Sequence, residues 1–155
     1  MTTTFTILCP EINYGCTLDV IDAAMESNVV IEGTRQKWSR IALTLSGRHL
    51  ALSSLVREQA GDKFSKLVLS LHTFFRTIPT DAVSNRSFLL SRIENVKMMI
   101  GVVDNPEFTE TDDRLETLWH ISESMNALIF NGDAALNLQG QRILDHAGKF
   151  DVVVE

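Results

Sequence analysis

Hydrophobic residues recur along the chain with two different periods, and each period predicts one kind of element. Alternation of hydrophobic and polar residues is typical of a β-strand, whereas hydrophobic residues three and four positions apart are typical of a helix. Alternating or short continuous runs predict strands at 4–9, 29–31, 38–45, 49–56, 97–103, 128–130, 135–138 and 142–144. Ser46 and Gly47 predict a tight turn, so the strands on either side of them are expected to form a hairpin.

Two helices are predicted in the middle of the chain. The stronger spans 62–78, with Asp62 as N-cap and Pro79 as the residue that stops it. Its hydrophobic residues form one continuous stripe, namely Phe64, Leu67, Val68, Leu71, Phe74, Phe75 and Ile78. The second spans 84–96, with Leu89, Ile93 and Val96 facing inward.

Two further helices are predicted nearer the ends of the chain. One spans 17–27, with Thr17 as N-cap and Asn28 closing it. The other follows 109–112, which resembles a capping box with aspartate in the place of glutamate. Its inward-facing residues are Leu115, Leu118, Trp119, Ser122 and Met125.

This order of elements predicts a single α+β domain over residues 1–155. We expect a mainly antiparallel or mixed sheet with about four helices packed on it, because the helical stripes need a sheet face to bury them. The order strand, helix, strand and hairpin occurs near the N-terminus and again from Lys97 onward. An internal duplication is therefore one hypothesis, although no residue-level repeat accompanies it.

Composition and charge exclude several classes of protein. Hydrophobic residues make up 45% and charged residues 22% of the 155 residues, as in an ordinary globular chain. The net charge of −6 argues against nucleic acid or an anionic membrane as the main partner, because both select positive surfaces. We expect a cytoplasmic protein with reduced thiols, because the N-terminus lacks signal-peptide features and there are two cysteines.

The sequence lacks the common catalytic motifs, which leaves isolated residues as candidates for chemistry. Glu116 and His120 are four residues apart on a predicted helix, and Glu123 follows three residues later. This spacing places an imidazole and carboxylates on one helix face, where they would suit a general base or a divalent metal. The alternative is a solvated helix face. A metal would need a third ligand from elsewhere, such as His72 or His146.

The two cysteines offer a second candidate. Cys16 precedes a predicted helix start, where the helix dipole favours a thiolate, and Cys9 lies in a predicted strand. They would form a nucleophile or a redox pair, or else they are two inert packed side chains. For His72, the simpler expectation is a half-buried ring bonded to a backbone carbonyl. Neither a metal nor a cofactor is predicted.

The other charged segments favour structural roles. The basic stretch 35–40, which contains Trp38, predicts a solvated strand entry more than a phosphate grip. The acidic stretch 104–116 is expected to complement a helix dipole, and 145–151 is predicted to be a turn because it lacks calcium-loop spacing.

A helix ending in 127–130 is followed by the turn at 131–132, a short hairpin through 138–140, and the Ile143–Leu144–Asp145 stretch before Gly148. Together with the opening strand, the hairpin around Ser46 and Gly47 and the strand at 97–103, these features make most of the chain resemble an uncharacterised bacterial domain family of unknown function. The resemblance implies bacterial origin and an α+β fold. It assigns no catalytic or binding residue.

Three functions remain as hypotheses. The first is a non-catalytic interaction or accessory module that binds a protein partner or a second copy of itself, because catalytic motifs are absent and a hairpin-rich C-terminal end leaves sheet edges available. The second is a small hydrolase or metal-dependent enzyme that uses Glu116, His120 and Cys16. The third is an acidic inhibitor or immunity-type protein, since residues 78–155 contain 13 acidic and 6 basic side chains.

Overall fold

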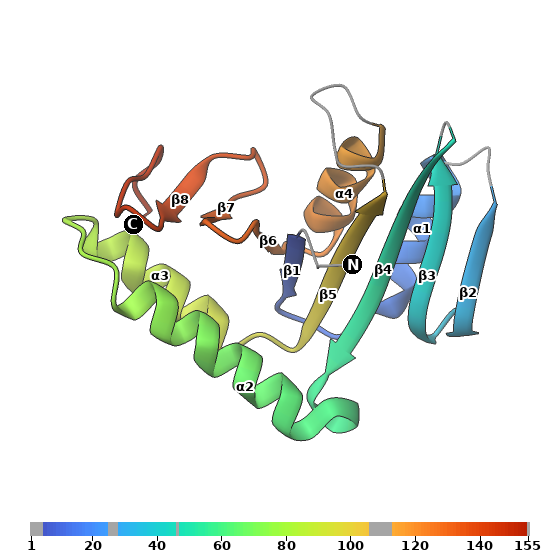
Figure 1. Cartoon of the computed structure of the whole chain (residues 1–155), viewed down its shortest axis with the longest axis horizontal. Helices are drawn as coiled ribbons and strands as arrows, with labels where there is room; N and C mark the ends of the chain where they lie inside the picture. The colour runs from blue at the N-terminus through green and yellow to red at the C-terminus, as the bar shows by residue number, and fades with distance from the viewer. Residues whose placement is uncertain (1–4, 25–27, 46, 106–112, 155) are drawn as a thin grey trace.

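One antiparallel sheet organises the molecule (Figure 1). The computed structural model describes residues 5–24, 28–45, 47–105 and 113–154. The strands found in these residues are β1 (Phe5–Cys9), β2 (Val29–Thr34), β3 (Lys37–Leu45), β4 (Arg48–Val56), β5 (Met98–Asn105), β6 (Leu128–Phe130), β7 (Ala134–Leu136) and β8 (Arg142–Asp145). The helices are α1 (Tyr14–Ala24), α2 (Arg57–Arg76), α3 (Val83–Glu94) and α4 (Asp113–Ser124). The predicted α+β fold is confirmed.

The eight strands lie in the order β2-β3-β4-β5-β1-β6-β7-β8, and all neighbours are antiparallel. The predicted hairpin is present as β3 and β4. Helix α1 connects β1 to β2 at one edge of the sheet, whereas α4 connects β5 to β6 across β1 alone. The strand order therefore differs between the two halves of the chain, and the duplication stays a hypothesis.

The sheet has helices on both faces. In β1, Ile7 and Cys9 belong to a core that includes residues of α1 and α4, while Leu8 belongs to a core that includes residues of α2 and α3. Because successive side chains of a strand point to opposite faces, the two helix pairs cover opposite faces. Buried Trp38 anchors the first core, and Phe75 lies in the second.

Helix α2 agrees with its predicted start but differs in its cap and its stripe. A first turn begins at Arg57, directly after β4, and non-helical Gly61 separates it from the regular helix, which starts at residue 62 as predicted. The non-helical residue at this break is Gly61 and not Asp62, so the prediction of Asp62 as N-cap is wrong. Gly61 has φ 36° and ψ −104°, which bends the helix before its regular part. Phe64 and Phe75 are buried as predicted, but Leu67 is 40% exposed and lines a hollow between α2 and the sheet.

Helix α1 also begins earlier than predicted, and its cap is a different residue. Oδ1 of Asn13 accepts the backbone N–H of Cys16 at 3.0 Å, as an N-cap side chain does. The prediction of Thr17 as N-cap is wrong, since this residue is buried one turn inside and its hydroxyl donates to Sδ of Met125. The predicted capping box at 109–112 lies outside the described residues.

The second face of the sheet is only partly covered. Helices α2 and α3 pack over the side of the sheet that contains Leu8, Met99 and Leu128. On the same face β2, β3 and β4 expose Val30, Arg40 and Ser53, respectively. This open face is visible in Figure 1 as the front of β2 to β4.

The two edges of the sheet are also unequal. Strand β8 is bonded on its outer side, because Arg142 and Asp151 exchange backbone and side-chain hydrogen bonds and Asn85 donates to the carbonyl of Ile143. Within the part of the chain that the structure describes, strand β2 pairs with β3 alone. The expectation that the C-terminal hairpins leave an edge available is therefore wrong, and the open edge is β2. None of the described helices is long and apolar enough to cross a bilayer.

Candidate functional site

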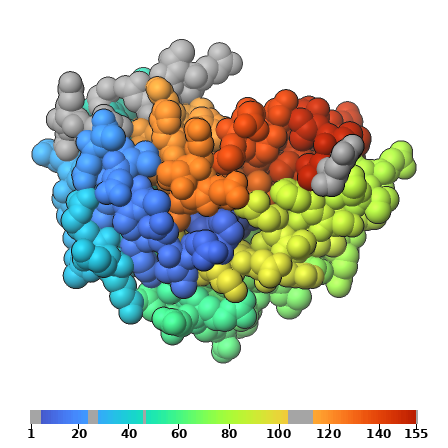
Figure 2. Space-filling model, turned by 180° about the vertical axis from the view of Figure 1, so that it is seen from behind, coloured from blue at the N-terminus to red at the C-terminus, as the bar shows by residue number. Residues whose placement is uncertain are grey.

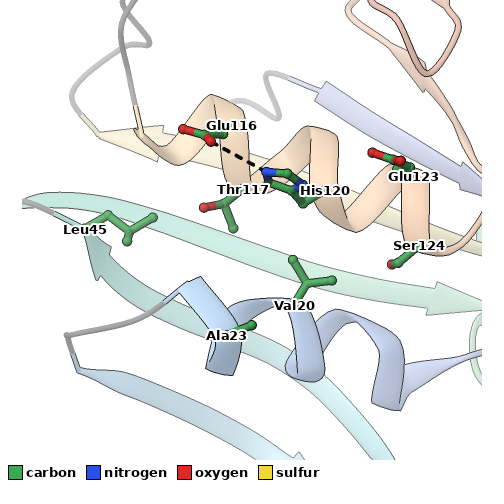
Figure 3. A pocket seen from close by; sticks show the side chains of 8 residues that line it. All are labelled: Val20, Ala23, Leu45, Glu116, Thr117, His120, Glu123 and Ser124. Carbon is green, nitrogen blue, oxygen red and sulfur yellow. Dashed lines mark ion pairs between the residues drawn. The ribbon is translucent and has the colours of Figure 1, made fainter.

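The sequence-predicted residues Glu116, His120 and Glu123 line a groove between α1 and α4. The two helices lie side by side at the surface (Figure 2), and the groove has a volume of about 850 Å³. Val20 and Ala23 contribute an apolar side from α1 (Figure 3). The full lining is Val20, Ala23, Leu45, Glu116, Thr117, His120, Glu123 and Ser124.

The helical spacing of α4 explains this arrangement. Leu118 and Ile121 are buried in the core below α4, so residues on its outer side face the groove and solvent. Nε2 of His120 lies 3.6 Å from Oε1 of Glu116, with 57% and 74% of the two side chains exposed. Water screens such an exposed pair, so its contribution to the free energy of folding is small.

The groove has the chemistry to attract a cationic group, but its metal-binding capacity is limited. A catalytic zinc ion takes three protein ligands. Within the part of the chain that the structure describes, no three His, Cys, Asp or Glu side chains gather closely enough to hold a metal. The proposed third ligands lie elsewhere: His72 is on α2 and His146 is in the turn after β8.

The environment of His72 differs from the expectation in one respect. Its side chain is half-buried as predicted, with 20% exposed. However, Nε2 of His72 lies 2.8 Å from Oε1 of Glu94 on α3, so the ring contacts a carboxylate where a backbone carbonyl was expected. This contact joins α2 to α3 on the face of the sheet opposite α4.

The cysteines lie in environments that oppose the nucleophile or redox hypothesis. Both thiols are free. Burial raises the pKa of Cys9 to about 12, so its thiol is protonated at neutral pH. Sγ of Cys16 accepts a hydrogen bond from Nδ2 of Asn13 at 2.9 Å, within the cap of α1. Neither the burial of Cys9 nor the contact of Cys16 with Asn13 resembles the histidine or lysine pairing that activates a thiol.

The basic segment is used for structure. Trp38 is buried, and its Nε1–H donates to the carbonyl of Tyr14 at 2.9 Å. The ring of Tyr14 meets it edge-on, with the centroids 5.7 Å apart. Arg35 pairs with Asp22 of α1, so the turn between β2 and β3 is tied to the neighbouring helix.

The predicted turn at 145–151 closes on its own backbone. Oδ1 of buried Asp145 accepts the N–H groups of Ala147 and Lys149, both at 2.9 Å, and Oδ2 accepts from Arg142 at 2.8 Å. Burial alone would raise the pKa of Asp145, but these hydrogen bonds outweigh it and lower the pKa. The carboxylate is thus occupied by protein donors.

A second hollow was not predicted from the sequence. It lies between α2 and the sheet, has a volume of about 550 Å³, and draws residues from β1, β4, β5, β6 and α2. The stripe of α2 indicated its helical side. Its other side depends on which strands are neighbours, and the chain order does not reveal this.

Comparison with protein-family models, curated proteins and solved structures gives no match. The resemblance to a bacterial domain family therefore remains an expectation.

Proposed function

We propose that the protein is a non-catalytic interaction module that pairs with a second copy of itself through the open edge of β2. The observation that supports this proposal is an outer strand whose backbone faces solvent and whose side chains include little edge protection. A strand added to such an edge gains main-chain hydrogen bonds along its length. The acidic half of the chain and the groove on α4 are not needed for this mode of binding.

The register of β2 identifies which backbone groups are available. The N–H of Thr44 donates to the carbonyl of Asn28 at 3.3 Å, so these two residues form a hydrogen-bonded pair. Because such pairs alternate along an antiparallel ladder, Val30 and Glu32 also bond to β3. The N–H and C=O groups of Val29 and Ile31 therefore point to the open edge.

The side chains of β2 leave this edge accessible. Proteins commonly protect edge strands with lysine, proline or an early bulge. In β2, Glu32 is the one charged residue, the bulge comes after it, and Val30 is 62% exposed. The stretch from Val29 to Ile31 therefore carries no charged side chain, no proline and no bulge.

A second copy fits this edge with a two-fold axis. An antiparallel pair centred on Ile31 places the outward N–H and C=O groups of Ile31 in the two copies opposite each other. Val30 then lies opposite Glu32, so no like charges face each other. The result would be one continuous sheet through both copies.

Sedimentation velocity over a range of protein concentrations tests the proposal with two variants. Wild type is expected at twice the chain mass of 17.3 kDa. Ile31→Pro removes an N–H that β3 does not use, so it should fold and sediment as a monomer. In the Val30→Glu variant, the new carboxylate of each copy lies opposite Glu32 of the other copy. We therefore expect the dissociation constant of the dimer to rise about tenfold.

Ile31→Val is the matched control, because it keeps the backbone donor and should remain dimeric. Circular dichroism verifies that each variant is folded. A monomeric wild type, or a folded Ile31→Pro variant that stays dimeric, would contradict the proposal.

A further inference from the structure

The hollow beside α2 is a groove with a defined direction. Its floor is a row of residues that are direct neighbours across four strands: Ser53 of β4, Gly101 of β5, Thr6 of β1 and Phe130 of β6. Its wall is one face of α2. Figure 1 shows α2 running from the end of β4 toward the side of the sheet that holds β6 to β8, and Phe74 near its C-terminal end contacts Phe130 of β6, so wall and floor run in the same direction.

The length of the groove follows from both surfaces. Along the wall, Lys63 and Phe74 are eleven positions apart, which is about 16 Å at the rise of a helix. Along the floor, three strand spacings separate β4 from β6, which is about 14 Å. The groove is therefore an elongated trough, and its middle is deepened by Gly101, which has no side chain.

The two ends of the groove differ in chemistry. At one end Phe74 and Phe130 meet edge to face, with ring centroids 5.6 Å apart. Near the other end lies Lys63, the one charged residue in a lining that otherwise consists of apolar and hydroxyl-bearing residues and Gly101. The apolar lining residues are Leu55, Leu67, Leu71, Phe74, Met99 and Phe130.

We propose that this groove binds a single molecule of an amphiphilic acid. Its carboxylate would lie at Lys63, and its alkyl chain would extend toward Phe74 and Phe130. The volume of about 550 Å³ lies in the range of small-molecule sites. Apolar contacts along the trough stabilise the chain, and Leu67, which is 40% exposed, loses contact with water when it is covered. The floor of the groove begins at Ser53 of β4, the strand that leads into α2, so a hydroxyl lies at the end opposite Phe130.

The charge of the lining selects the sign of the head group. Lys63 attracts a carboxylate, and none of the described residues that line this groove is acidic. The groove between α1 and α4 has the opposite character, because Glu116 and Glu123 line it. An anionic amphiphile is thus expected beside α2 and not beside α4.

Isothermal titration calorimetry with dodecanoate below its micelle concentration tests the site. Wild type is expected to bind one dodecanoate and to bind dodecyltrimethylammonium, which has the same chain and a positive head, more weakly. Lys63→Glu should weaken dodecanoate binding about tenfold, because an attraction at the surface becomes a repulsion. Lys66→Glu makes the same charge change on α2 outside the lining and should have little effect.

A second pair of variants tests the trough itself. Ser70→Trp fills the groove from an exposed position and should abolish binding, whereas Ser65→Trp, on an exposed position outside the lining, should not. Thermal unfolding verifies that all variants are folded. Equal binding of the cationic amphiphile, unchanged binding by folded Ser70→Trp, or no binding to wild type would each overturn the proposal. The site includes no residue of β2, so monomeric Ile31→Pro should bind dodecanoate like wild type.

Discussion

Burial separates the two cysteines, although they are only seven positions apart in the sequence. Cys9 lies within the core between the sheet and α1, and its pKa of about 12 keeps the thiol protonated. Cys16 is half-buried at the start of α1, where Asn13 bonds to both its N–H and its sulfur. The sequence predicted a strand cysteine and a helix-entry cysteine, but it did not reveal that only one of them reaches the surface.

Thiol labelling of the folded protein measures this difference. A reagent such as 5,5′-dithiobis(2-nitrobenzoate) is expected to modify Cys16 and to leave Cys9 unmodified until the protein unfolds. Cys16→Ser should remove the reactivity of the folded protein, and Cys9→Ala, as the matched control, should retain it. Rapid labelling of Cys9 in the native state would contradict the buried position of β1.

At the scale of elements, one asparagine connects α3 to the last strand and to the C-terminal segment. Asn85 is fully buried. Its Nδ2 donates to the carbonyls of Ile143 and Val152, and its Oδ1 accepts the N–H of Val154, all at 2.7 Å. The sequence predicted the helix and its inward leucine and isoleucine positions. It did not identify Asn85, because a polar residue in an amphipathic helix is expected to face solvent.

Asn85→Ala should therefore destabilise the protein strongly. We expect the free energy of unfolding to fall by about 2–4 kcal/mol, because the backbone groups of Ile143, Val152 and Val154 lose their partner. Urea unfolding monitored by circular dichroism gives this value. Asn95→Ala is the control, since Asn95 is exposed and its side chain donates to the carbonyl of Ser91 within the same helix, one turn earlier. Equal effects of the two substitutions would show that Asn85 does not connect these elements.

The predictions were most accurate for elements with a long hydrophobic pattern, which do not depend on contacts with distant segments of the chain. The hairpin of β3 and β4 follows from two alternating runs around Ser46 and Gly47. The start of α1 was wrong, because Asn13 caps it, and the prediction for α2 missed the extra turn that begins at Arg57 directly after β4. Local propensity alone does not set such boundaries, since tertiary contacts decide which residue ends the preceding strand.

At the scale of the whole molecule, acidic pH should loosen the C-terminal end. Asp151 forms a two-point contact with the guanidinium of Arg142, which lowers the pKa of that carboxylate to about 2. The pKa of Asp145, in the same network, is also lowered. A carboxylate with a lowered pKa in the folded state stabilises the fold above its unfolded pKa, and this stabilisation is lost as the pH falls through the folded value.

The free energy of unfolding is therefore expected to fall between about pH 4 and pH 2. Urea titrations at several pH values measure this change. Asp151→Asn should be less stable than wild type at pH 7 and should lose less stability on acidification, because it no longer takes up a proton. Parallel pH profiles for the two proteins would contradict the role of this network.

The linear pattern of side chains was sufficient for the class of fold. Alternation and helical spacing depend on neighbours along the chain, and they predicted the strands and the number of helices. Which strands became neighbours depended on packing between distant segments. That packing left β2 with an open edge, closed β8 with Asp151, and put Thr6 beside Gly101 under α2. Both proposed binding surfaces exist only after folding, because each is made from residues that the chain brings together from far apart or leaves without a neighbour.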